Sequence, residues 1–508
     1  MSLLGGLLFV VSALVVRGSS ISTIEENYLK FPAGFLIGTA TAAYQIEGAW
    51  NVSDKSENVW DRFTHEPRPG RIVNNDTGDV ACDSYHKYKK DVELLREIGF
   101  DVYRLSLSWS RILPNGFANK ISQDGLDYYK KVLAELEANG IEPLVTLYHW
   151  DHPQIIEDLG GWTNEEIVDY FGDYARVVFR ELGPRVKYFC TINEPEEFCA
   201  RGYGLGTKAP GKEIHGIGEY LCSHNVLKAH ARAYHIYDKE FRPTQNGTIG
   251  IVLSLSYAYP KDPDDATSVE THFQFNAGWF CHPIFSASGD YPSLMKEKIA
   301  SASLEQGYPR SRLPEFSQEW IEYIRGSSDF LGVNHYTSTL VEPGVESVVP
   351  SVFADRKIIL SPDPSWPRAN SSWLYVVPKG FGDLLRLLAK EYNNPVMYVT
   401  ENGVSAAEET NDLNRIQYFH DYLKEMLLAM NRDGVNVKGY LAWSLLDNFE
   451  WTQGYSERFG LVHVDFNDPE RKRTLKMSAN WWKNVLKTRK LEPVPAGPQS
   501  SCCTAIPV

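Results

Sequence analysis

Three short apolar runs follow one another at regular spacing in the first half of the chain: VYRLSLSW (102–109), PLVTLYH (143–149) and YFCTIN (188–193). They are rich in Val, Leu, Ile and aromatic residues, which is typical of strands buried on both faces of a parallel sheet. The segments between them place apolar residues every three or four positions, and this period predicts amphipathic helices. In the second of these segments, Thr163 and Glu166 predict a capping box at the helix start.

The same alternation of strand and helix extends over most of the chain. It gives eight predicted strands, Phe35–Ala43, Val102–Trp109, Pro143–His149, Tyr188–Asn193, Ile249–Ser256, Phe330–Tyr336, Met397–Thr400 and Gly439–Trp443. Strands that alternate with helices form parallel βαβ units, and eight such units close into a barrel. No change of composition and no Gly/Ser linker interrupts residues 25–490. We therefore expect an α/β protein, a single (β/α)8 TIM barrel at residues 21–490 with long strand-to-helix loops.

The two ends of the chain differ from this pattern. The apolar stretch from Leu3 to Val16 is too short to span a bilayer with margin and ends in small residues, so residues 1–20 are expected to be a signal peptide. Because no Lys or Arg precedes that stretch, an uncleaved anchor is the alternative. Residues 491–508 carry several prolines and are expected to form a flexible tail. We expect a secreted or lumenal protein with no membrane contact after signal cleavage, N-glycosylated at N-x-S/T sites Asn51, Asn75, Asn246 and Asn370.

Composition narrows the class further. The chain has 508 residues, 43% of them hydrophobic, and a formal net charge of −14. An acidic surface repels nucleic acid, so no nucleic-acid partner is expected. The seven cysteines are odd in number, so at least one is unpaired or pairs outside the chain. No spacing of Cys or His suggests a metal site, and no glycine-rich phosphate loop is present, so neither metal nor cofactor is expected.

Polar and aromatic side chains gather at the carboxyl ends of the predicted strands, where a barrel meets its substrate. In chain order they are Gln45, Glu47, Arg104, Trp109, His149, Trp150, Asn193, Glu194, Asn334, His335, Tyr336, Glu401, Asn402, Trp443, Glu450 and Trp451. Carboxylates, amides and indoles together suit sugars, whose apolar faces stack on Trp and whose hydroxyl groups need donors and acceptors. Glu194 and Glu401 come from the fourth and seventh strands and can supply the acid and the nucleophile of glycosidic cleavage.

At these residues the chain resembles the family 1 glycoside hydrolases, the β-glucosidases and their relatives. The resemblance covers nearly everything from Phe31 to about Leu486. It is carried by FPAGFLIGTATAAYQIEGAW (31–50), YRLSLSWSRILPNG (103–116), TINEP (191–195), GVNHYTS (332–338), YVTENG (398–403) and WSLLDNFEWTQGYSERFGLVHVDF (443–466). The form C-x-x-G-Y after TINEP and the segment RLPEF (312–316) resemble the animal branch, especially that of insects.

The resemblance implies a retaining β-glucosidase that acts on a small β-glucoside or an oligosaccharide. It implies that Glu194 is the general acid/base and Glu401 the nucleophile, with their carboxyl groups about 5–5.5 Å apart. Asn193 would hydrogen-bond the sugar 2-hydroxyl, Arg104 would orient Glu401 and hold it ionised, and Tyr336 would also reach Glu401. For Arg104 and Tyr336 a purely structural role is the alternative. The residues that match the family's site for the terminal, non-reducing sugar are Gln45, His149, Asn193, Trp443, Glu450 and Trp451.

Two further carboxylates are interpreted in different ways. Glu450, beside Gln45 and Trp451, is expected to accept hydrogen bonds from O4 and O6 of glucose as a charged carboxylate. Glu47 is read as a structural carboxylate at the barrel mouth and is left out of the site.

Two other functions compete with this hypothesis. A thioglucosidase uses the same scaffold, but plant enzymes of that kind replace the acid/base Glu with Gln, and here Glu194 is present. An animal thioglucosidase that keeps both carboxylates stays open as an alternative. A non-catalytic sugar-binding protein typically lacks one of the two catalytic carboxylates, and this chain has both. The pair Glu196 and Glu197 is expected to repel a sulfated aglycone, although Arg201 and Lys208 are close enough in sequence to reverse that sign.

Overall fold

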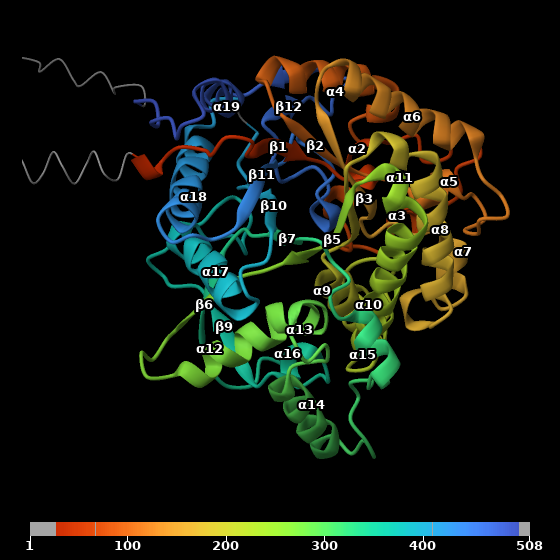
Figure 1. Ribbon diagram of the computed structural model, residues 1–508, viewed down its shortest axis with the longest axis vertical. Coiled ribbons are helices and arrows are strands. Elements are labelled where there is room, and N and C mark those ends of the chain that lie inside the picture. The colour runs from red at the N-terminus through yellow and green to blue at the C-terminus, as the bar shows by residue number, and fades with distance from the viewer. Residues whose placement is uncertain (1–26, 67, 409, 497–508) are drawn as a thin grey trace, which may run out of the picture.

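The computed structural model describes residues 27–66, 68–408 and 410–496 (Figure 1). Eight parallel strands form a closed barrel in the order β1-β11-β10-β7-β5-β4-β3-β2. Their bounds are Leu36–Ala40 (β1), Val102–Ser106 (β2), Glu142–Tyr148 (β3), Tyr188–Asn193 (β4), Thr248–Ser254 (β5), Leu331–Asn334 (β7), Met397–Asn402 (β10) and Val437–Trp443 (β11). Each predicted strand overlaps one of these, so the expected (β/α)8 TIM barrel is confirmed. The expected signal peptide and residues 497–508 of the expected tail lie outside the described residues.

Long helices follow the strands and surround the barrel (Figure 1). They are Ser84–Ile98 (α4), Gln123–Ala138 (α6), Ile167–Glu181 (α8), Gly218–Ile236 (α10), Pro378–Glu391 (α17), Leu413–Asn431 (α18) and Met477–Thr488 (α19). Neighbours in this ring pack side by side, as α8 does with α10, α17 with α18, and α19 with α4. The apolar stripe of each helix therefore closes over the barrel.

The predicted capping box at the start of α8 is wrong. The side chain of Thr163 donates to the carbonyl oxygen of Gly160 at 2.7 Å, one turn back along the chain. The backbone N–H of Glu166 donates to the side-chain oxygen of Asn164 at 3.1 Å. Asn competes effectively for such backbone donors, so the turn before α8 is organised by Asn164.

The loops after the strands carry further elements. Strands Tyr257–Pro260 (β6), Ser338–Pro343 (β8) and Ile358–Ser361 (β9) form a side sheet, and Val462–Val464 (β12) pairs with Arg473–Leu475 (β13). The remaining helices are Ala43–Ile46 (α2), Val59–His65 (α3), Trp109–Ile112 (α5), Gln154–Asp158 (α7), Pro195–Phe198 (α9), Arg242–Gln245 (α11), Ala266–Phe273 (α12), Trp279–Phe285 (α13), Ser293–Glu305 (α14), Gln318–Ile324 (α15) and Val352–Asp355 (α16). A disulfide joins Cys199 to Cys222, whereas Cys82, Cys190 and Cys281 are buried free thiols.

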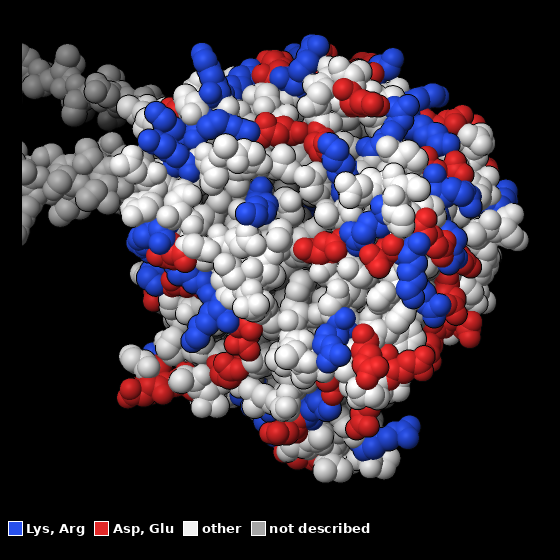
Figure 2. All heavy atoms as spheres, viewed as in Figure 1, with Lys and Arg blue, Asp and Glu red and all other residues white. Residues whose placement is uncertain are grey.

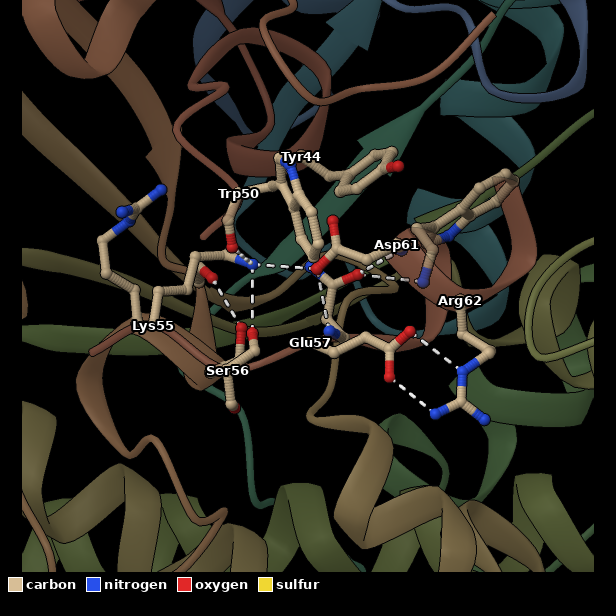
Figure 3. Close-up of polar contacts among 12 residues, drawn as sticks. Tyr44, Trp50, Lys55, Ser56, Glu57, Asp61 and Arg62 are labelled. Atoms are coloured by element: carbon tan, nitrogen blue, oxygen red, sulfur yellow. Dashed lines mark hydrogen bonds and ion pairs between the residues drawn. The ribbon is translucent and has the colours of Figure 1, made fainter. Parts of the chain in front are cut away.

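The long loop after β1 is held by a buried ion pair (Figure 3). The Lys55 ammonium lies 2.9 Å from Oδ2 of Asp61 and also donates to the carbonyl oxygens of Trp50 at 3.0 Å and Ser56 at 3.1 Å. Because the ion pair is buried, removal of either Lys55 or Asp61 would leave an uncompensated charge and would be strongly destabilising. The pair anchors α3, and α3 carries Trp60 into the core behind the candidate site.

The charges on the surface are mixed. On the face shown in Figure 2, Lys and Arg side chains lie among Asp and Glu side chains. Many charged side chains of the protein surface are ion-paired, as Arg176 is with Glu240 at 2.9 Å, and such exposed pairs contribute little to stability. Within the described ranges, no helix combines the length and the hydropathy needed to cross a membrane.

Candidate active site

A cavity of about 500 Å³ opens where the barrel strands end. Seven of the predicted site residues line it: His149, Glu194, Tyr336, Glu401, Trp443, Glu450 and Trp451. The other three, Gln45, Arg104 and Asn193, are fully buried and contact these lining residues from behind. The structure therefore brings all the predicted site residues together at one end of the barrel.

The carboxylate of Glu401, near the end of β10, is held at both oxygens. Arg104 on β2 donates from Nη1 to Oε1 at 2.6 Å, and the Tyr336 hydroxyl donates to Oε2 at 2.7 Å. Arg104 is itself fixed by Thr146, whose side-chain oxygen accepts from Nε at 3.0 Å. Glu401 is thus fixed by a buried ion pair and by a second, separate hydrogen bond. Burial, and then the charge of Glu401, raise the pKa of Tyr336 well above its usual value, so this phenol keeps its proton.

Glu194 directly follows β4 and is in the opposite situation. Burial, and then the negative charge of Glu401, raise the pKa of Glu194 well above its usual value. Asn334 donates from Nδ2 to Oε1 of Glu194 at 2.8 Å, which offsets part of that rise. Glu194 also has a left-handed backbone, with φ 45° and ψ 60°, immediately before α9. Such backbone strain on a non-glycine residue occurs at functional sites, because the surrounding structure must hold it.

Asn193 forms hydrogen bonds with three other residues around the cavity. Its Oδ1 accepts from Nη2 of Arg104 at 2.7 Å and from Asn334 at 3.2 Å, and its Nδ2 lies 3.0 Å from Nε2 of His149. Burial, and then the charge of Arg104, lower the pKa of His149 well below its usual value, so the imidazole is neutral. Since Nε2 accepts from Asn193, the proton is assigned to Nδ1, which has no partner among the described residues.

Gln45 and Glu450 form a second polar group at the cavity. Gln45 donates to the carbonyl oxygen of Phe449 at 2.9 Å and more weakly to Glu450 at 3.4 Å, while its Oε1 has no partner among the described residues. Burial, and then Glu457, raise the pKa of Glu450 to about 8. Glu450 therefore largely holds a proton at neutral pH in this environment, which corrects the expectation of a permanently charged acceptor.

The indole rings of the cavity are supported by other aromatic rings. The Trp451 ring centroid lies 4.7 Å from that of Trp60 on α3 and 4.6 Å from that of Trp150. Trp150 and Trp451 both have positive φ angles, 78° and 51°. Gly403 directly follows β10 and lies against Trp443. A Cβ on this residue would lie 2.0 Å from the Trp443 carbonyl oxygen. Only glycine fits that approach.

Some residues of the cavity were not assigned a role from the sequence. Asn334 contacts both Glu194 and Asn193, and the signal for it was a polar residue at the end of a buried strand. Trp373 is half exposed at the rim, and its ring is edge-on to Tyr336 at 5.7 Å. Glu47, left out of the site, accepts from Arg111 at 3.0 Å and is a structural carboxylate. Among the residues described, no group of three or more His, Cys, Asp or Glu has a metal-binding arrangement.

A parallel barrel with two differently held carboxyl groups in an indole-lined cavity defines the class of barrel glycosidases. The family model described as Glycosyl hydrolase family 1 matches residues 27–491. The chain therefore belongs to glycosyl hydrolase family 1, a family of glycosidases.

Known relatives agree with this assignment. Myrosinase 1 of Brevicoryne brassicae is 45% identical over 465 residues, which cover 91% of this chain and 99% of that protein. Cytosolic beta-glucosidase of Homo sapiens is 44% identical over 470 residues, with 91% and 99% covered. Lactase/phlorizin hydrolase of Homo sapiens is 45% identical over 483 residues, which are 94% of this chain, but the match spans only 25% of that longer protein.

A solved structure titled Aphid myrosinase has a TM-score of 0.87 and 45% identity, covering 91% of this chain and 100% of that one. The animal and insect relatives confirm the predicted branch of the family.

Proposed function

We propose that the protein is a retaining β-glucosidase that removes terminal, non-reducing β-D-glucosyl residues from aryl or alkyl glucosides or from oligosaccharides. One observation carries this proposal: Glu194 and Glu401 lie in the same cavity, where Glu401 is ion-paired with Arg104 while burial and the charge of Glu401 raise the pKa of Glu194 well above its usual value. Two carboxyl groups whose environments separate their pKa values are the arrangement needed for acid and nucleophile roles.

In the first step, ionised Glu401 attacks the anomeric carbon while Glu194 gives its proton to the leaving oxygen. Arg104 and Tyr336 hold the two oxygens of Glu401 and so aim the nucleophile. Retention requires that no water fits between the nucleophile and the sugar, and the carboxyl separation of about 5–5.5 Å stays a prediction.

In the second step the same two residues exchange roles. Formation of the glycosyl ester removes the negative charge of Glu401, which is one of the two main causes of the raised pKa of Glu194. Glu194 then loses its proton more readily and acts as the base for an attacking water. Attack from the face that the aglycone has left gives a product of retained configuration.

The groups around the cavity support recognition of one sugar ring. His149 Nδ1 and Gln45 Oε1 are a buried donor and a buried acceptor without partners among the described residues, and sugar hydroxyls would satisfy both. Glu450 adds a carboxyl group that can donate or accept. Trp443 and Trp451 supply indole surfaces for the apolar faces of the ring.

Hydrolysis of S-glucosides is the second candidate function, and the likeness to two proteins named as myrosinases favours considering it. A panel of rates separates the two: 4-nitrophenyl glucoside, galactoside and fucoside, cellobiose and a glucosinolate. The proposal predicts that the aryl glucoside is a good substrate, with fucoside and galactoside weaker or comparable. A glucosinolate hydrolysed as fast as the aryl glucoside would favour the thioglucosidase instead.

We also propose that the protein enters the secretory route and is N-glycosylated. The asparagines of all four N-x-S/T sites are exposed, as modification requires: Asn51, Asn75, Asn246 and Asn370. The family also includes a relative named as cytosolic, so the location needs its own test.

A further inference from the structure

One wall of the cavity carries two cations that share a single carboxylate. This wall, here called the cationic wall, consists of Glu197, Arg201, Thr207 and Lys208. These residues follow Glu194 through α9 and a π-helical turn, Cys199–Gly204 (η4). Nε of Arg201 lies 3.0 Å and Nζ of Lys208 lies 3.1 Å from the same oxygen, Oε2 of Glu197. One positive charge is therefore in excess on this side of the cavity.

The neighbouring acidic residues do not cancel that charge. Glu196 accepts a hydrogen bond from the backbone N–H of Ser254. Burial, and then Glu194, raise the pKa of Glu196 well above its usual value, which weakens its negative charge. Burial alone would raise the pKa of Glu197 too, but Arg201 and Lys208 outweigh it and bring the pKa to about 2. These contacts favour the alternative left open by the sequence, in which Arg201 and Lys208 reverse the sign expected from Glu196 and Glu197.

Lys208 faces the reacting centre. Its ammonium nitrogen lies 4.4 Å from the ring centroid of Trp150, which also lines the cavity. The Lys208 charge acts on both Glu194 and Glu450, where it opposes the larger effect of burial on each pKa. Offsetting the cavity carboxylates is an alternative role for Lys208, but the raised pKa of Glu194 and the pKa of about 8 for Glu450 favour the protonated forms of both, which leaves the Lys208 charge less fully offset.

Contacts within the protein hold the cationic wall in position before any ligand binds. The Cys199–Cys222 disulfide ties the start of the π-helical turn to α10. The backbone N–H groups of Thr207 and Lys208 donate to the carbonyl oxygen of Arg201 at 2.8 Å and 3.2 Å. Charges fixed before binding attract a ligand without a further ordering cost.

We infer that the cationic wall selects aglycones that carry a negative group, such as a carboxylate, sulfate or phosphate, within reach of Lys208. The inference rests on the proposed function, which places the leaving group on the side of the cavity next to Glu194. It concerns the charge of the aglycone and holds for O-glucosides as well as for S-glucosides.

The test compares two O-glucosides that differ in aglycone charge: 4-(carboxymethyl)phenyl and 4-(carbamoylmethyl)phenyl β-D-glucoside. The methylene group insulates the phenol oxygen, so the two leaving groups have similar reactivity. The measured quantity is the ratio of kcat/KM, acid over amide, at low ionic strength. Because the side chains of Lys208 and Arg201 are 20% and 41% exposed, we expect a ratio of about five, the size of one partly solvated ion pair.

Lys208→Gln and Arg201→Gln each remove the excess charge and should bring the ratio to about one. The matched control is Lys212→Gln, on the same loop but outside the cavity lining, which should keep the wild-type ratio. About 1 M NaCl should also bring the wild-type ratio close to one, because the screening length is then about 3 Å. A wild-type ratio of one or less, or a ratio that neither cavity substitution changes, would overturn the inference. Turnover of the amide glucoside reports separately on the proposed function.

Discussion

Replacing Asn334 with alanine should move the basic limb of the pH–rate profile to higher pH. Asn334 donates a hydrogen bond of 2.8 Å to Glu194, and a donor favours the charged form of a carboxyl group. Its removal therefore raises the pKa of Glu194 further. In the proposed mechanism Glu194 must be protonated when the glycosidic bond breaks, so the variant should stay active to higher pH than the wild type.

The size of the shift follows from the strength of one hydrogen bond. Bonds to a charged group contribute about 1.5–3 kcal/mol, and 1.36 kcal/mol corresponds to one pKa unit. Asn334 shares its Nδ2 with Asn193 at 3.2 Å, so we expect the lower end, about one pH unit. Thr400, which donates to Oδ1 of Asn334 at 2.7 Å, loses its acceptor, and stability should fall by about 1–3 kcal/mol.

The assay is kcat/KM for phenyl β-glucoside, whose leaving group needs protonation, from about pH 4 to about pH 9. The matched control is Asn402→Ala, another buried amide, whose side chain contacts His335, Tyr418 and Tyr440 and neither catalytic carboxylate. The control should lose stability without a shift of the basic limb. A basic limb that stays in place or moves to lower pH in Asn334→Ala would refute the reasoning.

Three further predictions concern the sugar site, the cavity wall and export. Glu450→Ala should lower kcat/KM for glucosides about a hundredfold, as leaving one or two buried sugar hydroxyl groups unpaired would, and wild-type rates would show that Glu450 does not bind the sugar. Cys199→Ser combined with Cys222→Ser opens a loop with a sequence separation of 23 residues and should cost about 3 kcal/mol, seen in calorimetry as a lower Tm; an unchanged Tm would contradict this. Mass spectrometry of the secreted protein should find residues 1–20 missing and a glycan on at least one of Asn51, Asn75, Asn246 and Asn370. An intact Met1 without any glycan would contradict export.

The barrel strands could be predicted from the sequence because each is a short apolar run buried on both faces, as in Tyr188–Asn193. The side sheet of β6, β8 and β9 was missed because its strands are short and mostly half exposed, so they lack that pattern. The capping box failed for a different reason. Thr163 and Glu166 have the right spacing, but Asn164 lies between them and competes for the same backbone donors.

The residues of the candidate site could be predicted because they lie at strand ends within motifs that resemble those of the family, as Glu194 does in TINEP and Glu401 in TENG. Their charge states could not be predicted so well. Glu450 gains a raised pKa from burial, which depends on everything packed around it. The charge of the cavity wall depends on Arg201 and Lys208 meeting one oxygen of Glu197, and only the folded turn brings them together.

The proposed double displacement through Glu401 and Glu194 is tested most directly by the configuration of the first product. An aryl β-glucoside is hydrolysed in the NMR tube, and the anomeric proton of the released glucose is observed before mutarotation proceeds. The account predicts that β-glucose forms first and α-glucose follows only by mutarotation, because each of two displacements inverts the anomeric carbon. Early accumulation of α-glucose would mean a single displacement by water and would contradict the roles assigned to both carboxyl groups.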